Sequence, residues 1–310
     1  MPVDDASYRP WDGTARPSRL ASLAIAGTMI RRLLRNRLLR VLVTYAPIMA
    51  CVISVVIFGV TYSEEMATVR RAATARGPAG PGGAIAAMIS GDTLAQVNRW
   101  VFPPLLLLAV VVAAFAGAPL IAEDRRARSL ALYFSRPIRH FDYVAGKFLT
   151  LAFFLGLFLL APPICIYLTD CAMSNVDGTA IDHLPTFGRS LVPGVLACLV
   201  FGSLAIGASS LVERTNHAVL LFFGVIMLSF FLSQLISRPV LRDPDWLAIA
   251  PQTAIMRIHV DLMAIEQERF MSRAHFRALD VGVAWNSVWL WTAAGFGVLV
   301  WRIRKVEVVS

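Results

Sequence analysis

A charged segment, Ile121–Lys147, separates two long apolar runs and carries the side chains best placed to act on another molecule. Guanidinium and carboxylate groups in such a segment favour charge-assisted contacts with a partner. Pro137 disfavours helical geometry at Arg136, so we predict a helix over Glu123–Phe134, a break, and a second helix starting at His140–Asp142. The candidate contact residues are Glu123, Arg125, Arg126, Ser135, Arg136 and Pro137.

The rest of the chain carries no recognisable catalytic or metal-binding pattern. The motifs G-x-x-x-x-G-K-[ST], HExxH and GxSxG do not occur. Asp170, Asp177, Asp182 and His183 cluster in one segment, but their spacing matches no ligand motif. The four cysteines form neither a CxxC pair nor a disulfide framework. We therefore expect no enzyme activity and no bound cofactor or metal in this chain.

The composition is that of an integral membrane protein. The 310 residues are 57% hydrophobic and 16% charged, whereas roughly a quarter of the residues in soluble domains are charged. Runs of about 20 apolar residues can cross a hydrocarbon layer of ~30 Å. Six such runs predict an all-α protein with six spans and a single transmembrane domain over 1–310; the runs are 41–62, 101–121, 148–168, 191–211, 217–236 and 281–301.

The basic residues predict the orientation in the membrane. With both termini on one side, that side holds 18 of the 29 Arg and Lys residues. The positive-inside rule then places both termini in the cytoplasm, with the chain in the cell (inner or plasma) membrane. No Asp, Glu, Lys or Arg lies within the six predicted spans. The net charge of +9 is thus explained by orientation and attraction to membrane lipid, without nucleic acid as a partner.

The segment before the first span has the pattern of an amphipathic helix. Residues 1–18 are polar and proline-containing, and we expect a cytoplasmic tail there. Over 20–40, apolar residues recur at steps of three and four. Arginines within a span would cost ~2.5–3.5 kcal/mol each near its centre, so we expect this helix to lie along the membrane surface. Its arginines include Arg31, Arg32 and Arg35.

The segment Ile121–Lys147 resembles one particular family. Glu123, Ser129-Leu130, Ser135-Arg136-Pro137-Ile138, Arg139 and Gly146-Lys147 are similar to the loop after the second span in permease subunits of type-2 ATP-binding-cassette (ABC) exporters. Arg128-Ser129 departs from the Gly-Thr or Gly-Ile that commonly precedes the leucine in that family.

The resemblance implies a role for each part. The loop would be a coupling helix that docks on a separate ATPase subunit, which would use ATP. Residues 20–40 would be an elbow helix, with Arg31, Arg32 and Arg35 as a possible second edge of the docking surface. Two permease subunits, alike or different, would pair, and external helices would lie between spans five and six. Substrate identity stays open.

Three alternatives remain at this point. The small residues Ala113, Ala114, Gly117 and Ala118 suit either a seam between subunits or packing within one bundle. The periodic segment Thr253–Ala278 suits external helices or a plain surface helix. The whole chain could instead be a non-transporting scaffold or sensor, or a lipid-modifying membrane enzyme.

Overall fold

The computed structural model describes part of the chain, and every regular element in that part is a helix. The described residues are 21–37, 39–41, 44–45, 48–49, 52–53, 56, 93–127, 140–173, 184–237, 243–263 and 278–307. The individually described residues between 37 and 56 are helical, but most of the predicted first span, 41–62, lies outside the described residues. Its crossing of the membrane therefore stays a prediction.

Five helices in the described part are long and apolar enough to cross a membrane. The stretches with this property are Val101–Arg126, Phe141–Leu159, Leu184–Leu211, Thr215–Leu235 and Val281–Arg302. They belong to α4 (Thr93–Arg126), α6 (His140–Leu159), α9 (Leu184–Leu211), α10 (Thr215–Leu235) and α13 (Val281–Glu307). Each overlaps one of the predicted spans, and most extend beyond it because a helix continues past the apolar residues that hydropathy detects.

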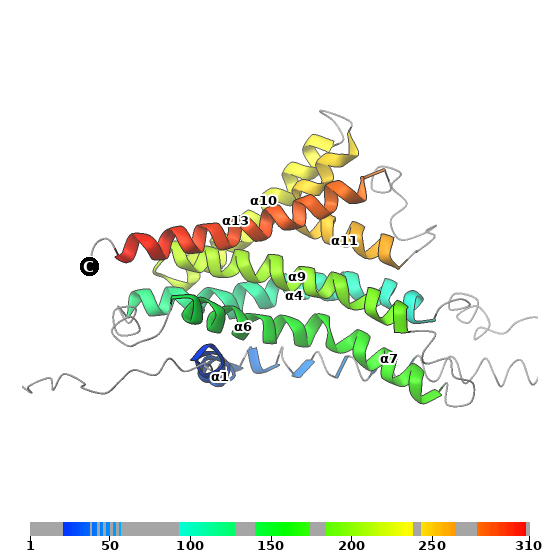
Figure 1. The fold of residues 1–310 in the computed structure, drawn as a ribbon, viewed down its shortest axis with the longest axis horizontal. Helices are drawn as coiled ribbons and strands as arrows, with labels where there is room; N and C mark the ends of the chain where they lie inside the picture. The colour runs from blue at the N-terminus through cyan, green and yellow to red at the C-terminus, as the bar shows by residue number, and fades with distance from the viewer. Residues whose placement is uncertain are drawn as a thin grey trace, which may run out of the picture.

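These helices form a bundle organised around α9, which contacts α4, α6, α10 and α13 (Figure 1). The end of α4, the start of α6, the turn 212–214 between α9 and α10, and the end of α13 all lie toward one end of the bundle, on the left of Figure 1. We call this the basic end, after Arg125, Arg126, Arg214 and Arg302. Helix α10 leans away from the others and exposes Leu220, Leu228 and Phe231.

Small residues let α9 approach its neighbours closely. A Cβ atom on Gly295 of α13 would lie 2.6 Å from the carbonyl carbon of Ser203, and one on Gly207 would lie 2.8 Å from the Gly295 carbonyl oxygen. On the other side, a Cβ on Gly117 of α4 would lie 2.6 Å from that of Ala205. The small residues of α4 therefore pack within this bundle, which decides between the two alternatives raised by the sequence.

The predicted third span, 148–168, is divided in the structure. Helix α6 ends at Leu159, and α7 (Ala161–Met173) begins after a turn at Leu160. Pro162 and Pro163 follow directly and have no N–H group to donate to the preceding turn. A proline pair near the end of a span predicts a kink or an early end of the helix, and the break in the structure lies beside this pair, so the single 148–168 helix is not present.

The predicted 20–40 helix is shorter than expected. Helix α1 (Ala21–Leu33) ends in a turn at Leu34–Asn36, where the Arg40 Nε donates to the Leu34 carbonyl at 3.1 Å. Figure 1 shows α1 nearly end-on beside α6, which runs across the picture, so the two helices cross steeply. Gly146 permits this contact, since a Cβ there would lie 2.8 Å from the Ile25 Cβ and from the Ser22 carbonyl.

The chain folds back into the bundle between α10 and α13. A 3₁₀ helix, η2 (Pro244–Ile249), leads into α11 (Pro251–Leu262), whose Ala254, Ile255 and Ile258 are fully buried. Trp291 of α13 donates to the Ile249 carbonyl at 2.9 Å. This burial excludes a plain surface helix for residues 251–262, whereas residues 264–277 of the predicted segment lie outside the described residues.

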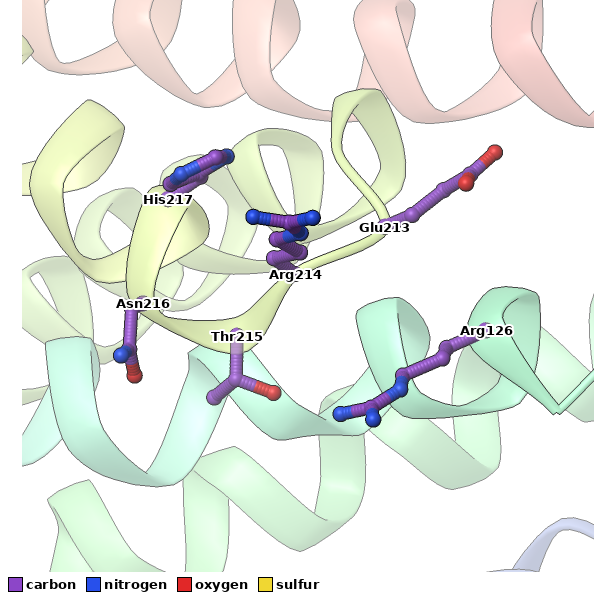
Figure 2. A pocket seen from close by; sticks show the side chains of 6 residues that line it. All are labelled: Arg126, Glu213, Arg214, Thr215, Asn216 and His217. Atoms are coloured by element: carbon purple, nitrogen blue, oxygen red, sulfur yellow. The ribbon is translucent and has the colours of Figure 1, made fainter.

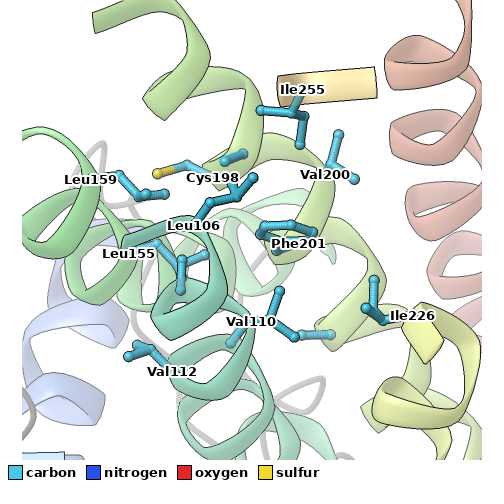
Figure 3. Close-up of a cluster of buried hydrophobic side chains, with 14 of the residues drawn as sticks. Leu106, Val110, Val112, Leu155, Leu159, Cys198, Val200, Phe201, Ile226 and Ile255 are labelled. Atoms are coloured by element: carbon cyan, nitrogen blue, oxygen red, sulfur yellow. The ribbon is translucent and has the colours of Figure 1, made fainter. Parts of the chain in front are cut away.

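Apolar side chains fill the middle of the bundle (Figure 3). They come from most of the described helices and include Val110 of α4, Leu155 of α6, Phe201 of α9, Ile226 of α10 and Ile255 of α11. The largest of these, Phe201, is fully buried. The bundle is therefore a packed core rather than a wall around an open passage at this position.

Candidate functional site

The last turn of α4, Glu123–Arg126, contacts several neighbouring helices at the basic end of the bundle. Consecutive residues on a helix point about 100° apart. The four side chains of this turn therefore reach four different neighbours: α1, α6, the end of α9 and the start of α10.

Asp124 makes the most buried of these contacts. Its carboxylate accepts a hydrogen bond from the Tyr143 hydroxyl at 2.8 Å and lies 2.7 Å from the Lys147 Nζ. The Lys147 side chain is 0% exposed and that of Asp124 is 6% exposed. The Lys147 ammonium also lies 3.6 Å from the Met29 Sδ of α1. Because a buried charge is tolerated only when paired, Asp124 and Lys147 fix α4 against α6 beneath α1.

Glu123 points to the other side, toward α1. Its carboxylate lies 2.7 Å from the Arg32 guanidinium, and the two side chains are 40% and 59% exposed. An exposed pair of this kind contributes about 0–1 kcal/mol. It aligns α1 with the end of α4 but adds little to the strength of the attachment.

Arg125 turns toward the end of α9. Its guanidinium donates to the Ser210 carbonyl at 2.7 Å and to the Glu213 carboxylate at 3.3 Å. The Arg125 side chain is only 11% exposed, whereas that of Glu213 is 69% exposed. Arg125 therefore acts mainly within the bundle, and Arg126 is the exposed arginine of this turn.

One turn earlier, α4 is held by Ser209 of α9. The Ser209 hydroxyl accepts hydrogen bonds from the amides of Ile121 (3.1 Å) and Ala122 (3.0 Å) and donates to the Ala118 carbonyl (2.7 Å). Ala122 and Ala118 are the partners that an undistorted helix would join directly. Pro119 lies between them and has no amide hydrogen. A proline next to an inserted side chain is a site where a helix bends.

The structure therefore brings together some of the residues predicted from the sequence. Arg32 contacts Glu123, which joins the predicted second edge to the predicted coupling segment. Arg31 and Arg35 are exposed on and after α1. Ser135, Arg136 and Pro137 lie outside the described residues, as does most of the predicted Glu123–Phe134 helix, of which α4 includes residues up to Arg126.

Sequence reasoning missed Asp124, Tyr143, Lys147 and Ser209. The six predicted spans hold no charged residue, but the apolar helices Val101–Arg126 and Phe141–Leu159 extend past two of them and include the buried Asp124–Lys147 pair. The predicted ranges 101–121 and 148–168 stopped just short of both residues. A signal existed in the four-residue spacing of Tyr143 and Lys147, which places them on one helix face.

Among the described residues, no group of His, Cys, Asp and Glu is arranged to hold a metal ion. Asp177, Asp182 and His183 lie outside that part of the chain. The side chains of the basic end hold neighbouring helices together, and Arg126 and Arg214 are exposed there.

Comparison with known proteins gives the family. The model of the ABC-2 family transporter protein matches residues 23–272, which is most of the chain. The chain belongs to the ABC-2 transporter family. A search of curated proteins found no match. Together with the five apolar helices, membership identifies a multi-pass membrane permease component of an ABC transporter, a class that works with an ABC ATPase subunit.

Proposed function

We propose that this ABC-2 protein is an exporter permease that couples ATP hydrolysis by a separate ATPase subunit to substrate movement. The last turn of α4 carries this proposal. The segment that resembles a coupling helix joins Ala127, just after the end of α4, to His140 at the start of α6. Asp124 and Lys147 join the two helices at those points. A force applied to the segment would therefore move the end of α4 and the start of α6 together.

In this proposal, some of the predicted coupling residues contact other helices of this chain and others contact the ATPase. Glu123 contacts Arg32 of α1, and Arg125 contacts the end of α9, so these two residues would transmit movement to neighbouring helices. Ser135, Arg136 and Pro137 would contact the ATPase, with the exposed Arg31 and Arg35 forming the second edge. ATP would bind only to the ATPase subunit, and this chain would hold no cofactor of its own. The basic end would face the cytoplasm, with both termini there, in the cell membrane.

The packed core favours a second permease subunit. Apolar side chains fill the middle of the bundle (Figure 3), so a substrate path is better placed at the boundary between two bundles than within one. Exposed apolar residues on α10 and α13, such as Phe231 and Leu290, supply surfaces for that partner and for lipid. Helix α11, buried at the opposite end from Arg126, would close the path on the outer side.

The direct test is co-purification. The tagged permease, extracted in mild detergent from cells that also make its native neighbours, should retain an ATPase with Walker motifs. Arg136→Glu should remove that ATPase and abolish transport while leaving the protein in the membrane. The control is Arg189→Glu, because Arg189 is an exposed arginine at the other end of α9.

Two results would contradict the proposal. Full transport by the Arg136→Glu variant would exclude the coupling role of the segment. Purified protein that never carries an ATPase, but binds a regulator or modifies lipid, would favour the scaffold or the membrane enzyme.

A further inference from the structure

Two adjoining hollows lie at the basic end, between the end of α4, the turn 212–214 and the end of α13. The first has a volume of about 470 Å³ and is lined by six residues (Figure 2): Arg126, Glu213, Arg214, Thr215, Asn216 and His217. The second, of about 390 Å³, shares three of these and adds Arg125, Leu211, Val212 and Arg302. Both lie within the range of roughly 300–1,000 Å³ that is typical of small-ligand sites.

The charges around these hollows are unbalanced. Four arginines, Arg125, Arg126, Arg214 and Arg302, line them, against a single carboxylate, Glu213. Glu213 pairs with Arg125, and within the described part of the chain the other three arginines make no ion pair. The Nε of Arg302 is buried and has no hydrogen-bond partner among the described residues. An anion in the hollows would relieve the repulsion between these arginines.

The start of α10 adds a second set of donors. Arg214 occupies the N-cap position and its side chain makes no capping hydrogen bond. The first amides of a helix lack partners within the helix, and the helix dipole there favours negative charge. Figure 2 shows Arg126 extending from α4 toward Thr215 at this helix start. Backbone amides and guanidinium groups therefore line the same hollow.

The surroundings favour a lipid as the source of the anion. Leu211, which lines the second hollow, is 40% exposed, and Trp301, next to Arg302, is 51% exposed. An exposed tryptophan beside basic residues at the end of an apolar helix is typical of the membrane–water interface. Basic pockets between membrane helices on the cytoplasmic side bind anionic lipid headgroups.

We propose that the hollows formed by Arg125, Arg126, Arg214 and Arg302 at the start of α10 bind the phosphate headgroup of an anionic phospholipid. Such a lipid would bridge the end of α4, the start of α10 and the end of α13, and its acyl chains would lie along the apolar surface near Leu211. This site rests on the membrane placement in the proposed function and does not depend on coupling to an ATPase.

The test uses the full-length protein in nanodiscs that contain either phosphatidylglycerol or only phosphatidylcholine, with retained lipid measured by native mass spectrometry. The protein should retain phosphatidylglycerol preferentially. The double variant Arg214→Gln with Arg302→Gln should weaken this retention by about 30-fold, at roughly fivefold for each arginine near the membrane surface. Arg189→Gln, which removes an exposed arginine from the other end of α9, should retain the lipid as the parent protein does.

The outcomes separate the possible readings. Equal retention of the two lipids, or unchanged retention by the double variant, would overturn the site. Complete displacement of phosphatidylglycerol by millimolar inorganic phosphate would overturn the lipid as its occupant. If the double variant is not recovered from the membrane, the single Arg214→Gln change on the exposed turn gives the same test with about a fivefold loss. Retention of the ATPase by the lipid-deficient variant would show that the two proposals stand independently.

Discussion

Replacing Lys147 by Met should destabilise the protein strongly, because it leaves the buried Asp124 carboxylate without its cation. The Lys147 side chain is 0% exposed and lies 2.7 Å from Asp124, whose side chain is 6% exposed. Removing one partner of a buried ion pair typically costs about 3–5 kcal/mol, since the remaining charge cannot reach water. Met has a length similar to that of the Lys side chain, so the volume of the site is largely kept.

The matched double variant isolates the charge effect. Asp124→Asn with Lys147→Met removes both charges and keeps an acceptor for the Tyr143 hydroxyl, which donates to Asp124 at 2.8 Å in the parent protein. Replacing both members of a buried pair by neutral groups is often close to neutral. The free energy of unfolding of the double variant should therefore be within about 1 kcal/mol of that of the parent protein, and well above that of the Lys147→Met variant.

The measurement is thermal unfolding of the purified proteins in one mild detergent. At roughly 2 °C per kcal/mol for a chain of this size, the apparent Tm of the Lys147→Met variant should fall by about 6–10 °C. Arg32→Met is the control, because the exposed Arg32–Glu123 pair should cost about 1 kcal/mol or less. Additive losses in the double variant, or equal losses for Lys147→Met and Arg32→Met, would refute the reasoning.

Two further predictions concern Ser209 and His259. Ser209→Ala removes the hydroxyl that bonds to two amides and one carbonyl of α4, so the free energy of unfolding should fall by about 1–3 kcal/mol. Ser229→Ala removes a hydroxyl that bonds to its own helix, so it should lower the free energy of unfolding by less. The apparent Tm of each variant measures this difference. Burial of His259 on α11 lowers its pKa from 6.5 to about 4. Between pH 6.5 and pH 4, His259 binds a proton in the unfolded chain but not in the folded chain. The folded state therefore loses up to about 3 kcal/mol of stability as the pH falls through this range. His259→Phe, which can keep the stacking on Phe102, should flatten the fall in Tm between pH 6.5 and pH 4 relative to the parent; identical pH profiles would exclude this role.

The five apolar helices in the described part of the chain and the break at Leu160 could be predicted because they depend on local sequence. Hydropathy over about 20 residues fixes where a helix can cross a membrane, and prolines fix where a helix loses its amide donors. Two helix ends could be predicted as well. Helix α4 continues past the apolar run that ends at Ile121 as far as Arg126, within the helix predicted over Glu123–Phe134, and α6 begins at His140, where the sequence predicts the start of the second helix.

The contacts of the site could not be predicted, because each depends on how helices pack. Asp124 and Lys147 are separated by the whole coupling segment, and Ser209 lies 88 residues from Ile121. A serine in an apolar helix usually bonds to its own helix, as Ser203 and Ser210 do here. Only the packing of α9 against α4 turns Ser209 toward the distorted turn at Pro119. The role of Arg125 was obscured for the same reason, since its charge suggested a surface contact.

The strengths of the contacts around the last turn of α4 indicate where this helix can move. Asp124 and Lys147 are buried together. If they were separated, each charge would remain buried without its partner and without water, which would cost several kcal/mol. The Glu213 carboxylate is 69% exposed, so it can exchange its contact with Arg125 for water at little cost, whereas Arg125 keeps its hydrogen bond to the Ser210 carbonyl. A force on the segment that resembles a coupling helix should therefore carry α6 along with α4 and open the contact between Arg125 and Glu213. The hydrogen bonds from Ser209 to α4 beside Pro119 lie about one helical turn before that contact. Since the proposed lipid site occupies the same opening, an anionic lipid bound there would hold the two sides together and oppose the movement, whereas its release would favour it.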